Sequence, residues 1–201
     1  MKDEYLSIDR EASATLKVEG SKFTALACPV ASRQEADAKL KAIRKEYFDA
    51  HHHCFAYVIG CEGEDFRSSD DGEPTGTAGV RILSAIRAKD LSDVLIVVVR
   101  YFGGVKLGVG GLGRAYADAA TSALSGCSTI TKIVGEELLV TFPYTETSGV
   151  MNAMNRLHAR IIDTTYDDDV LIRCSIRKRD AKALTGELIN VTRGNIAVKQ
   201  A

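Results

Sequence analysis

The chain has 201 residues, of which 45% are hydrophobic and 26% are charged, and its formal net charge is −1 at pH 7. A chain of this length suits one or two globular domains with a real core. The near-neutral charge excludes a global basic field for nucleic acid, and no segment approaches the roughly 18 apolar residues of a membrane helix. We therefore expect a cytoplasmic protein without a membrane partner, in which any contact with nucleic acid depends on a local cationic patch.

The N-terminal part of the chain predicts a β-hairpin followed by a helix. Residues 11–18 and 23–30 alternate between apolar and polar side chains, and Gly20 and Ser21 would supply the turn between them. Residues 32–48 repeat apolar side chains at steps of three and four, which is typical of a helix with one buried stripe. Ser32 would cap this helix, with Glu35 at the capping-box position.

The middle of the chain predicts two strands and a short helix. Residues 51–60 form the first strand, and residues 69–79 are dense in turn-forming residues. A short helix through Ala88 follows, which Thr77 would cap. Residues 94–99 are a continuous β-branched and aliphatic run, which indicates a strand buried on both faces.

A glycine-rich stretch follows this strand, and it carries the only three charges of residues 95–116: Arg100, Lys106 and Arg114. Residues 108–113 match the pattern G-x-G-x-x-G, but a dinucleotide-binding motif requires these glycines directly after the strand and an acidic residue about 20 residues further on, and neither condition is met. Glycine backbone N–H groups and the start of the next helix, predicted over 112–124, could instead bind RNA phosphate. The alternative is that the glycines serve close packing of helix on sheet.

From Glu136 a second pattern begins. Strands are predicted at 138–142, 159–166, 170–177 and 195–199, with helices at 147–157 and 180–189. This βαββαβ order is the ferredoxin-like arrangement. We place the domain boundary at 133–135, which gives domains 1–134 and 135–201.

His52 and Cys54 share one face of the predicted strand 51–60, while His51 and His53 share the other. Two ligands on a face are too few for a zinc site without a ligand from outside the strand, so we favour a hydrogen-bonded histidine beside a packed thiol over the alternative of a metal site. We expect no cofactor. His52 and Cys54 also raise the hypothesis of a thiolate hydrolase in which an acid of the 70–73 turn orients the histidine. No nucleophile-elbow sequence supports it, and we assign no catalytic residue.

Three motifs together resemble the IMPACT/YigZ family over residues 15–127. They are His52-x-Cys54-x-Ala56, Ser69-Asp70-Asp71-Gly72-Glu73-Pro74-x-Gly76-Thr77-Ala78-Gly79, and Val98-Val99-Arg100-Tyr101-Phe102-Gly103-Gly104-x-Lys106-Leu107-Gly108-x-Gly110-Gly111-Leu112-x-Arg114-Ala115-Tyr116. Residues 136–201 resemble the small C-terminal domain of the bacterial members.

The resemblance implies an α+β fold of two domains. The N-terminal domain would have the ribosomal-protein-like βαβ fold of domain IV of elongation factor G, and the C-terminal domain would be ferredoxin-like, as in domain V of that factor. Eukaryotic relatives are linked to translational control, because they block the activator of the starvation-responsive initiation-factor kinase. Their N-terminal RWD domain has no counterpart in this sequence, so that partner is not carried over.

We therefore expect a non-enzymatic protein that contacts RNA or the translation machinery and regulates translation. The residues expected to bind RNA are Arg100, Tyr101, Gly103, Gly104, Lys106, Gly111 and Arg114. The residues expected to form an acidic wall opposite them are Asp70, Asp71 and Glu73, with His52 and Cys54 in the cleft between. The alternatives are a hydrolase-like enzyme built on His52 and Cys54, and a protein-interaction module. The sequence predicts no oligomeric state.

Overall fold

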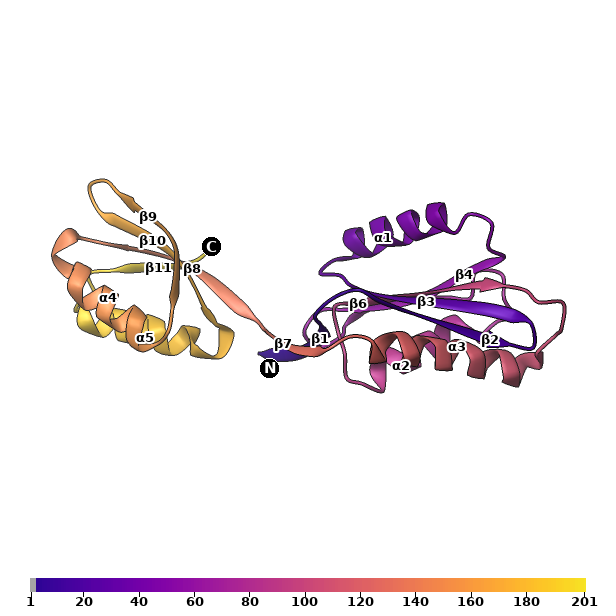
Figure 1. The fold of residues 1–201 in the computed structure, drawn as a ribbon. Coiled ribbons are helices and arrows are strands. Elements are labelled where there is room, and N and C mark those ends of the chain that lie inside the picture. Colours follow the sequence, from indigo (N-terminus) through magenta and orange to yellow (C-terminus); the bar gives the residue numbers. More distant parts are fainter. Residues whose placement is uncertain (1–2) are drawn as a thin grey trace. The chain divides into compact units, whose positions relative to one another are not determined.

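The structure of this protein is a computed structural model that describes residues 3–201. The chain forms two compact units, with the boundary between Lys132 and Ile133, and each unit has its own sheet and core (Figure 1). In the described residues, no helix has the length and apolar character needed to cross a membrane. The α+β fold with two domains is confirmed.

The N-terminal unit is built on a five-stranded antiparallel sheet with the strand order β2-β3-β6-β4-β5. The strands are β2 (Ala12–Val18), β3 (Ser21–Pro29), β4 (His52–Ile59), β5 (Asp65–Ser69) and β6 (Val94–Tyr101). Because β3 and β4 both pair antiparallel with β6, they run parallel to each other on either side of it. Helix α1 connects them, so β3, α1 and β4 form a βαβ unit that is split by β6.

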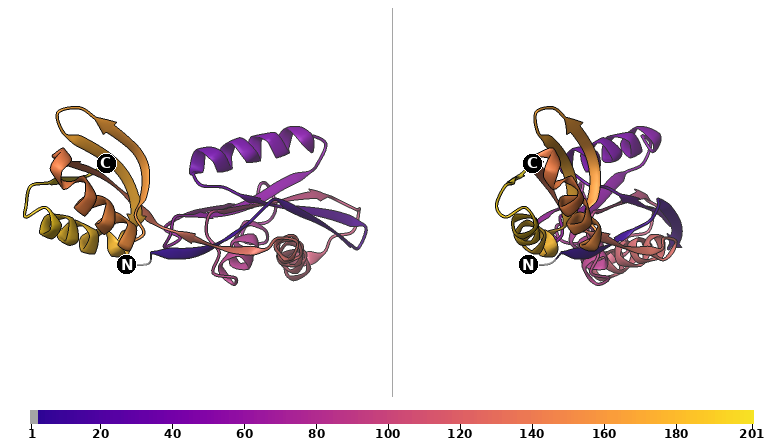
Figure 2. Two further views of the ribbon diagram at one scale, coloured as in Figure 1. Left: turned by 60° about the vertical axis from the view of Figure 1, so that its left-hand side comes forward. Right: turned by 90° about the vertical axis from the view of Figure 1, so that its left-hand side faces the viewer.

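Helices cover both faces of this sheet. Helix α1 (Arg33–Glu46) lies on one face, and α2 (Gly79–Arg87) and α3 (Gly108–Ser125) lie on the other (Figures 1 and 2). Alternate residues of β6 serve the two cores: Ile96 and Val98 pack in the core with α2 and α3, whereas Val97 and Val99 pack in the core with α1. The prediction of a strand buried on both faces is confirmed.

Two strands that the sequence did not predict lie outside the main sheet of the N-terminal unit. Strand β1 (Glu4–Ile8) pairs with β7 (Thr129–Ile133), from the other end of the unit. The buried carboxylate of Asp93 accepts hydrogen bonds from the Tyr5 hydroxyl at 2.5 Å and from the Lys132 ammonium at 2.8 Å. Side chains from both strands thus converge on one acid.

Several local predictions hold and others need correction. Ser32 caps α1 and accepts a hydrogen bond from the Glu35 backbone N–H at 3.2 Å. The hairpin turn consists of Glu19 and Gly20, both with positive φ, so Ser21 is not in the turn but is the first residue of β3. A two-residue turn with both φ values positive matches the twist of the paired strands, which explains the shift.

Two helices also begin differently from the prediction. Thr77 does not cap α2, because its hydroxyl donates to the Pro74 carbonyl at 2.6 Å. Helix α3 begins at Gly108 rather than at Leu112, so three glycines expected in the loop, Gly108, Gly110 and Gly111, lie inside it. The first turn was not predicted because glycine has a low intrinsic helix propensity, and three of its first four residues are glycines.

The C-terminal unit has the predicted βαββαβ order. Its elements are β8 (Gly135–Phe142), α4 (Thr147–Arg156), β9 (Arg160–Tyr166), β10 (Val170–Arg177), α5 (Ala181–Val191) and β11 (Ala197–Gln200), with short 3-10 turns at Tyr144–Glu146 and Lys178–Asp180. The sheet is antiparallel with the order β11-β8-β10-β9, which is the ferredoxin-like arrangement. Phe142, Met154 and Leu184 are fully buried in its core.

Candidate functional site

Arg100 stands near the end of β6 with its guanidinium on the α2 and α3 side of the sheet. Its Nη1 lies 2.6 Å from Oε1 of Glu73, and the two side chains are 7% and 4% exposed. The guanidinium also lies 5.3 Å from the ring centroid of Phe23 and 5.4 Å from that of Phe102. Arg100 is therefore a buried cation whose charge is already compensated, rather than the surface cation that the sequence suggested.

The ion pair belongs to a larger polar network that the sequence did not predict. The Tyr116 hydroxyl of α3 donates to Oε1 of Glu73 at 2.7 Å, and the Cys54 thiol donates to the Tyr116 oxygen at 3.3 Å. Tyr116 is completely buried, so its hydroxyl requires such partners. The sequence offered one indication of this role for Tyr116: it is the last residue of the third motif, and it lies on the apolar side of the predicted helix.

Cys54 lies beneath the site and not in an open cleft. Its side chain has no exposed surface, and its single thiol proton has two acceptors in reach, the Asp70 carbonyl at 3.0 Å and the Tyr116 oxygen at 3.3 Å. Burial, assisted by the nearby Glu73 and Asp71 carboxylates, raises the pKa of the Cys54 thiol to about 12. Because the thiol stays protonated near neutral pH, this geometry contradicts the thiolate hypothesis.

Asp70 does not form an acidic wall, because its carboxylate is occupied by the backbone around the start of α2. It accepts hydrogen bonds from the N–H groups of Gly76 at 2.8 Å, Ala78 at 2.9 Å and Gly79 at 2.8 Å. Burial by itself would raise the pKa of Asp70, but these three donors hold it below its ordinary value. Asp70 supplies the cap that Thr77 does not.

The other two acids of this turn point to different partners. Asp71 accepts from the His53 backbone N–H at 2.7 Å and pairs with Arg44 of α1 at 2.6 Å. Only Glu73 reaches the predicted site, where its Oε2 lies 3.9 Å from Nε2 of His52. The predicted acidic wall opposite the basic residues is therefore not present as a unit, and a direct ion pair between Glu73 and Arg100 takes its place.

A pocket of about 350 Å³ opens above the ion pair. It is lined by Glu73, Pro74, Arg100, Phe102, Lys106, Leu107, Gly108, Val109 and Leu112. Three of the predicted site residues, Glu73, Arg100 and Lys106, therefore share one pocket. Its apolar lining includes the side chains of Phe102 and Val109, which are both exposed.

The glycines of the signature have separate physical roles. Gly103 meets the β2–β3 turn so closely that a Cβ there would lie 1.9 Å from the carbonyl carbon of Gly20. Gly104 is exposed and has a φ of +89°, which a side chain rarely adopts. Gly111 lies within the first turns of α3 and is not a loop residue. Close packing accounts for Gly103, while the conformation of the loop accounts for Gly104.

Arg114 and Tyr101 also lie outside this pocket. Arg114 lines a separate pocket of about 350 Å³ together with Arg81, Gly110, Gly113 and Ala117. Tyr101 lies on the α1 face, where its hydroxyl donates to Asp49 at 2.7 Å and raises its own pKa through that bond. No sequence pattern selects Arg81, which comes beside Arg114 through the packing of α2 on α3.

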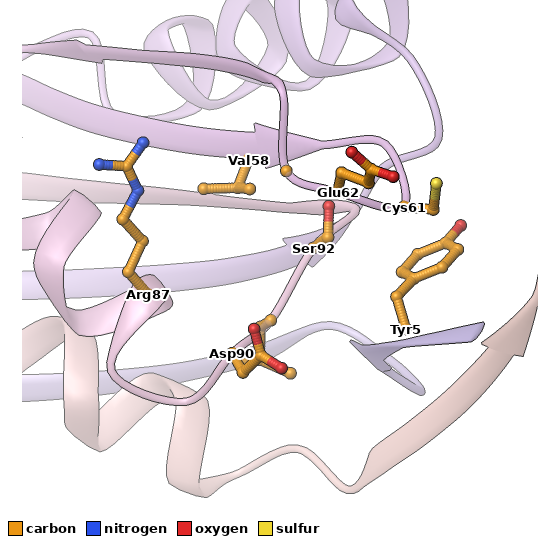
Figure 3. Close-up of a pocket in the computed structure, with 9 residues that line it drawn as sticks. Tyr5, Val58, Cys61, Glu62, Arg87, Asp90 and Ser92 are labelled. Carbon is orange, nitrogen blue, oxygen red and sulfur yellow. The ribbon is translucent and has the colours of Figure 1, made fainter. Parts of the chain in front are cut away.

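A further pocket, of about 270 Å³, lies at the other end of the sheet and contains none of the predicted residues. Figure 3 shows Arg87 on the opposite side of it from Tyr5 and Cys61.

In the part of the chain that the structure describes, no group of three or more histidine, cysteine or acidic side chains is arranged to hold a metal ion. The pocket at Arg100 is therefore the candidate site.

Comparisons with known proteins cover both units. The Impact N-terminal domain matches residues 19–124, and a domain of unknown function, DUF1949, matches residues 140–195. The chain is 29% identical to the IMPACT family member YvyE of Bacillus subtilis, over 98% of this chain and 90% of that protein, and 30% identical to YigZ of Escherichia coli, over 90% and 89%. A crystal structure of an hypothetical protein matches with a TM-score of 0.75 and 28% identity, over 98% of this chain and 97% of that one.

Proposed function

The chain belongs to the IMPACT family, and from this premise we propose that it is a non-enzymatic protein that contacts RNA of the translation machinery and thereby regulates translation. The contact surface is the beginning of α3, residues 108–114, together with the loop of residues 102–107 that leads into it. Both segments belong to the longest of the sequence motifs that indicate the family.

The observation that carries this proposal is an uncapped helix start surrounded by cations. Helix α3 begins at Gly108 without a side-chain cap, and a Cβ at Gly108 or Gly110 would meet nothing within 4 Å. The free N–H groups of a helix start and its positive dipole favour a phosphate group. The glycines leave space for an anion to approach this backbone closely.

Basic side chains flank the helix start on two sides. Lys106 is exposed on the rim of the Arg100 pocket, and Arg81 and Arg114 line the pocket on the other side of the first turn. The structure gives Lys106 and Arg114 no ion-pair partner among residues 3–201. Unpaired surface cations can neutralise phosphates and release their counterions, which supplies sequence-independent affinity.

The burial of the Cys54 side chain and the raised pKa of its thiol favour the RNA contact over the enzymatic alternative. The protein-interaction alternative has an observation in its favour, because the same surface exposes Val105 (49%) in the loop and Val109 (68%) at the start of α3. Co-sedimentation with ribosomes before and after nuclease treatment separates the two ideas. A protein contact would survive loss of the RNA, whereas the proposed RNA contact would not.

Lys106→Ala tests the proposed surface, and filter binding of ribosomal RNA at increasing salt measures the result. We expect weaker binding at every RNA sequence and a slope of log affinity against log salt that is smaller by about 0.7 to 0.9. Lys41→Ala, which removes an exposed cation from α1 on the other face of the sheet, is the matched control and should bind like the unmodified protein. Salt-insensitive binding, or equal effects of the two variants, would contradict the proposal.

A further inference from the structure

We infer that the pocket lined by Glu73, Arg100 and Phe102 receives one unpaired nucleobase, so that the protein selects single-stranded over duplex RNA. This inference rests on the proposed function and specifies how the RNA is held.

The walls of the pocket suit a planar aromatic ligand. Its volume of about 350 Å³ is within the range of small-ligand sites, and its sides are Pro74, Phe102, Leu107, Val109 and Leu112. The Phe102 ring is 42% exposed although it packs over the Arg100 guanidinium. Unstacked RNA bases are commonly held by aromatic side chains of this kind, because every base has a π-face.

Two of the residues that line the pocket have polar atoms that lack full partners, one a donor and the other an acceptor. Nε of Arg100 is buried and has no hydrogen-bond partner within residues 3–201, although Nη1 and Nη2 have Glu73 and Ser21. Oε1 of Glu73 accepts from both Arg100 and Tyr116, whereas Oε2 has His52 Nε2 only at 3.9 Å. A buried unsatisfied donor is costly, which points to a ligand that supplies an acceptor.

A nucleobase supplies the missing groups. The Watson–Crick edge of every RNA base carries an N–H donor next to an oxygen or nitrogen acceptor, and such an edge is free only in an unpaired base. The acceptor matches Arg100 Nε and the donor matches Glu73 Oε2. Because Nε is buried, the proposed contact requires a local rearrangement of the pocket wall. Because all four bases have such a pair, the site does not select one base.

The pocket is continuous with the proposed phosphate site. Lys106 and Gly108 line the pocket, and Gly108 is also the first residue of α3. A nucleotide with its base in the pocket therefore has its phosphate near the Lys106 ammonium and the helix start. In a duplex the base edges are paired and the bases remain stacked, so they cannot enter.

The test compares binding of a fluorescently labelled single-stranded RNA oligonucleotide with binding of the same sequence as a duplex. We expect Phe102→Ala to weaken single-strand binding by about 5- to 150-fold, which corresponds to one lost base stack. Phe102→Trp should restore it, because the larger ring also stacks. Phe48→Ala is the matched control, since Phe48 is 82% exposed in the turn that follows α1.

The outcomes separate this inference from the proposed function. If Lys106→Ala weakens RNA binding but Phe102→Ala does not, and duplex competes as well as single strand, the base pocket is overturned while the RNA contact stands. If no RNA binds, both fail. As a second measurement, 4-thiouridine in the oligonucleotide should crosslink on irradiation to the peptide spanning residues 102–112, and crosslinks confined to other segments would also overturn the inference.

Discussion

Arg100 and Lys106 stand in the same glycine-rich segment and carry the same formal charge, but the structure gives them different tasks. The Arg100 side chain is 7% exposed and paired with Glu73, whereas Lys106 is exposed on the rim of the pocket above it. The first is held by strand β6 in a core, and the second by a loop between strand and helix. The difference shows that a family signature combines residues that build a site with residues that are free to bind.

The largest effect is expected when the buried pair is broken. Glu73→Ala leaves the Arg100 charge inside the protein without its partner and removes the acceptor of the Tyr116 hydroxyl. We expect the free energy of unfolding to fall by about 3–5 kcal/mol. Because the chain has no tryptophan, circular dichroism during chemical denaturation is a suitable readout.

A double variant, Glu73→Ala with Arg100→Leu, serves as the control for this prediction. It removes both charges, so it should recover part of the lost stability. A loss below about 1 kcal/mol for Glu73→Ala alone would mean that Arg100 finds water or another partner and is not a dependent member of the core.

A smaller effect is expected at Asp70, the acid beside this pair that caps α2. Asp70→Asn should lower the free energy of unfolding by about 0.5–2 kcal/mol near neutral pH, because an amide accepts the three backbone hydrogen bonds less well. The folded-state pKa of Asp70 lies below its ordinary value of 3.8, so the carboxylate's contribution is present above pH 3.8 and is lost as pH falls from there through the folded pKa.

The difference in melting temperature between the unmodified protein and Asp70→Asn should therefore shrink in acid. Asp37→Asn, at an exposed position of α1, is the control and should change stability by no more than about 0.5 kcal/mol. A difference that stays constant through this pH range would contradict the capping role of the ionised carboxylate.

The smallest effect on stability is expected at Lys106. Lys106→Ala should leave the free energy of unfolding within about 0.5 kcal/mol of the unmodified protein, because the side chain is exposed and has no ion-pair partner in the described chain. Arg100→Ala, with the same change in formal charge, should destabilise strongly because it leaves Glu73 buried and unpaired. Equal losses of stability in the two variants would erase the contrast between them.

Local sequence patterns were sufficient for the C-terminal unit. The strands and helices of this unit were predicted from the spacing of apolar residues within each segment. Their order along the chain then gave the βαββαβ arrangement. In the N-terminal unit, strands β1, β5 and β7 were missed. Strands β1 and β7 pair with each other from opposite ends of the unit, and β5 has mostly polar or exposed side chains, so neither case leaves a strong local signal.

The sequence by itself determined the α+β class, the cap of α1 by Ser32, the doubly buried strand β6 and the motifs that indicate the family. Only the tertiary structure decided which members of those motifs bind one another. Glu73 binds both Arg100 and Tyr116, and Tyr116 in turn contacts Cys54. Asp70 binds the backbone at the start of α2, and Arg114 and Lys106 line different pockets. The physical reason is that a charged side chain has the same local pattern whether its partner is water or a buried carboxylate, and that partner comes from a distant part of the chain.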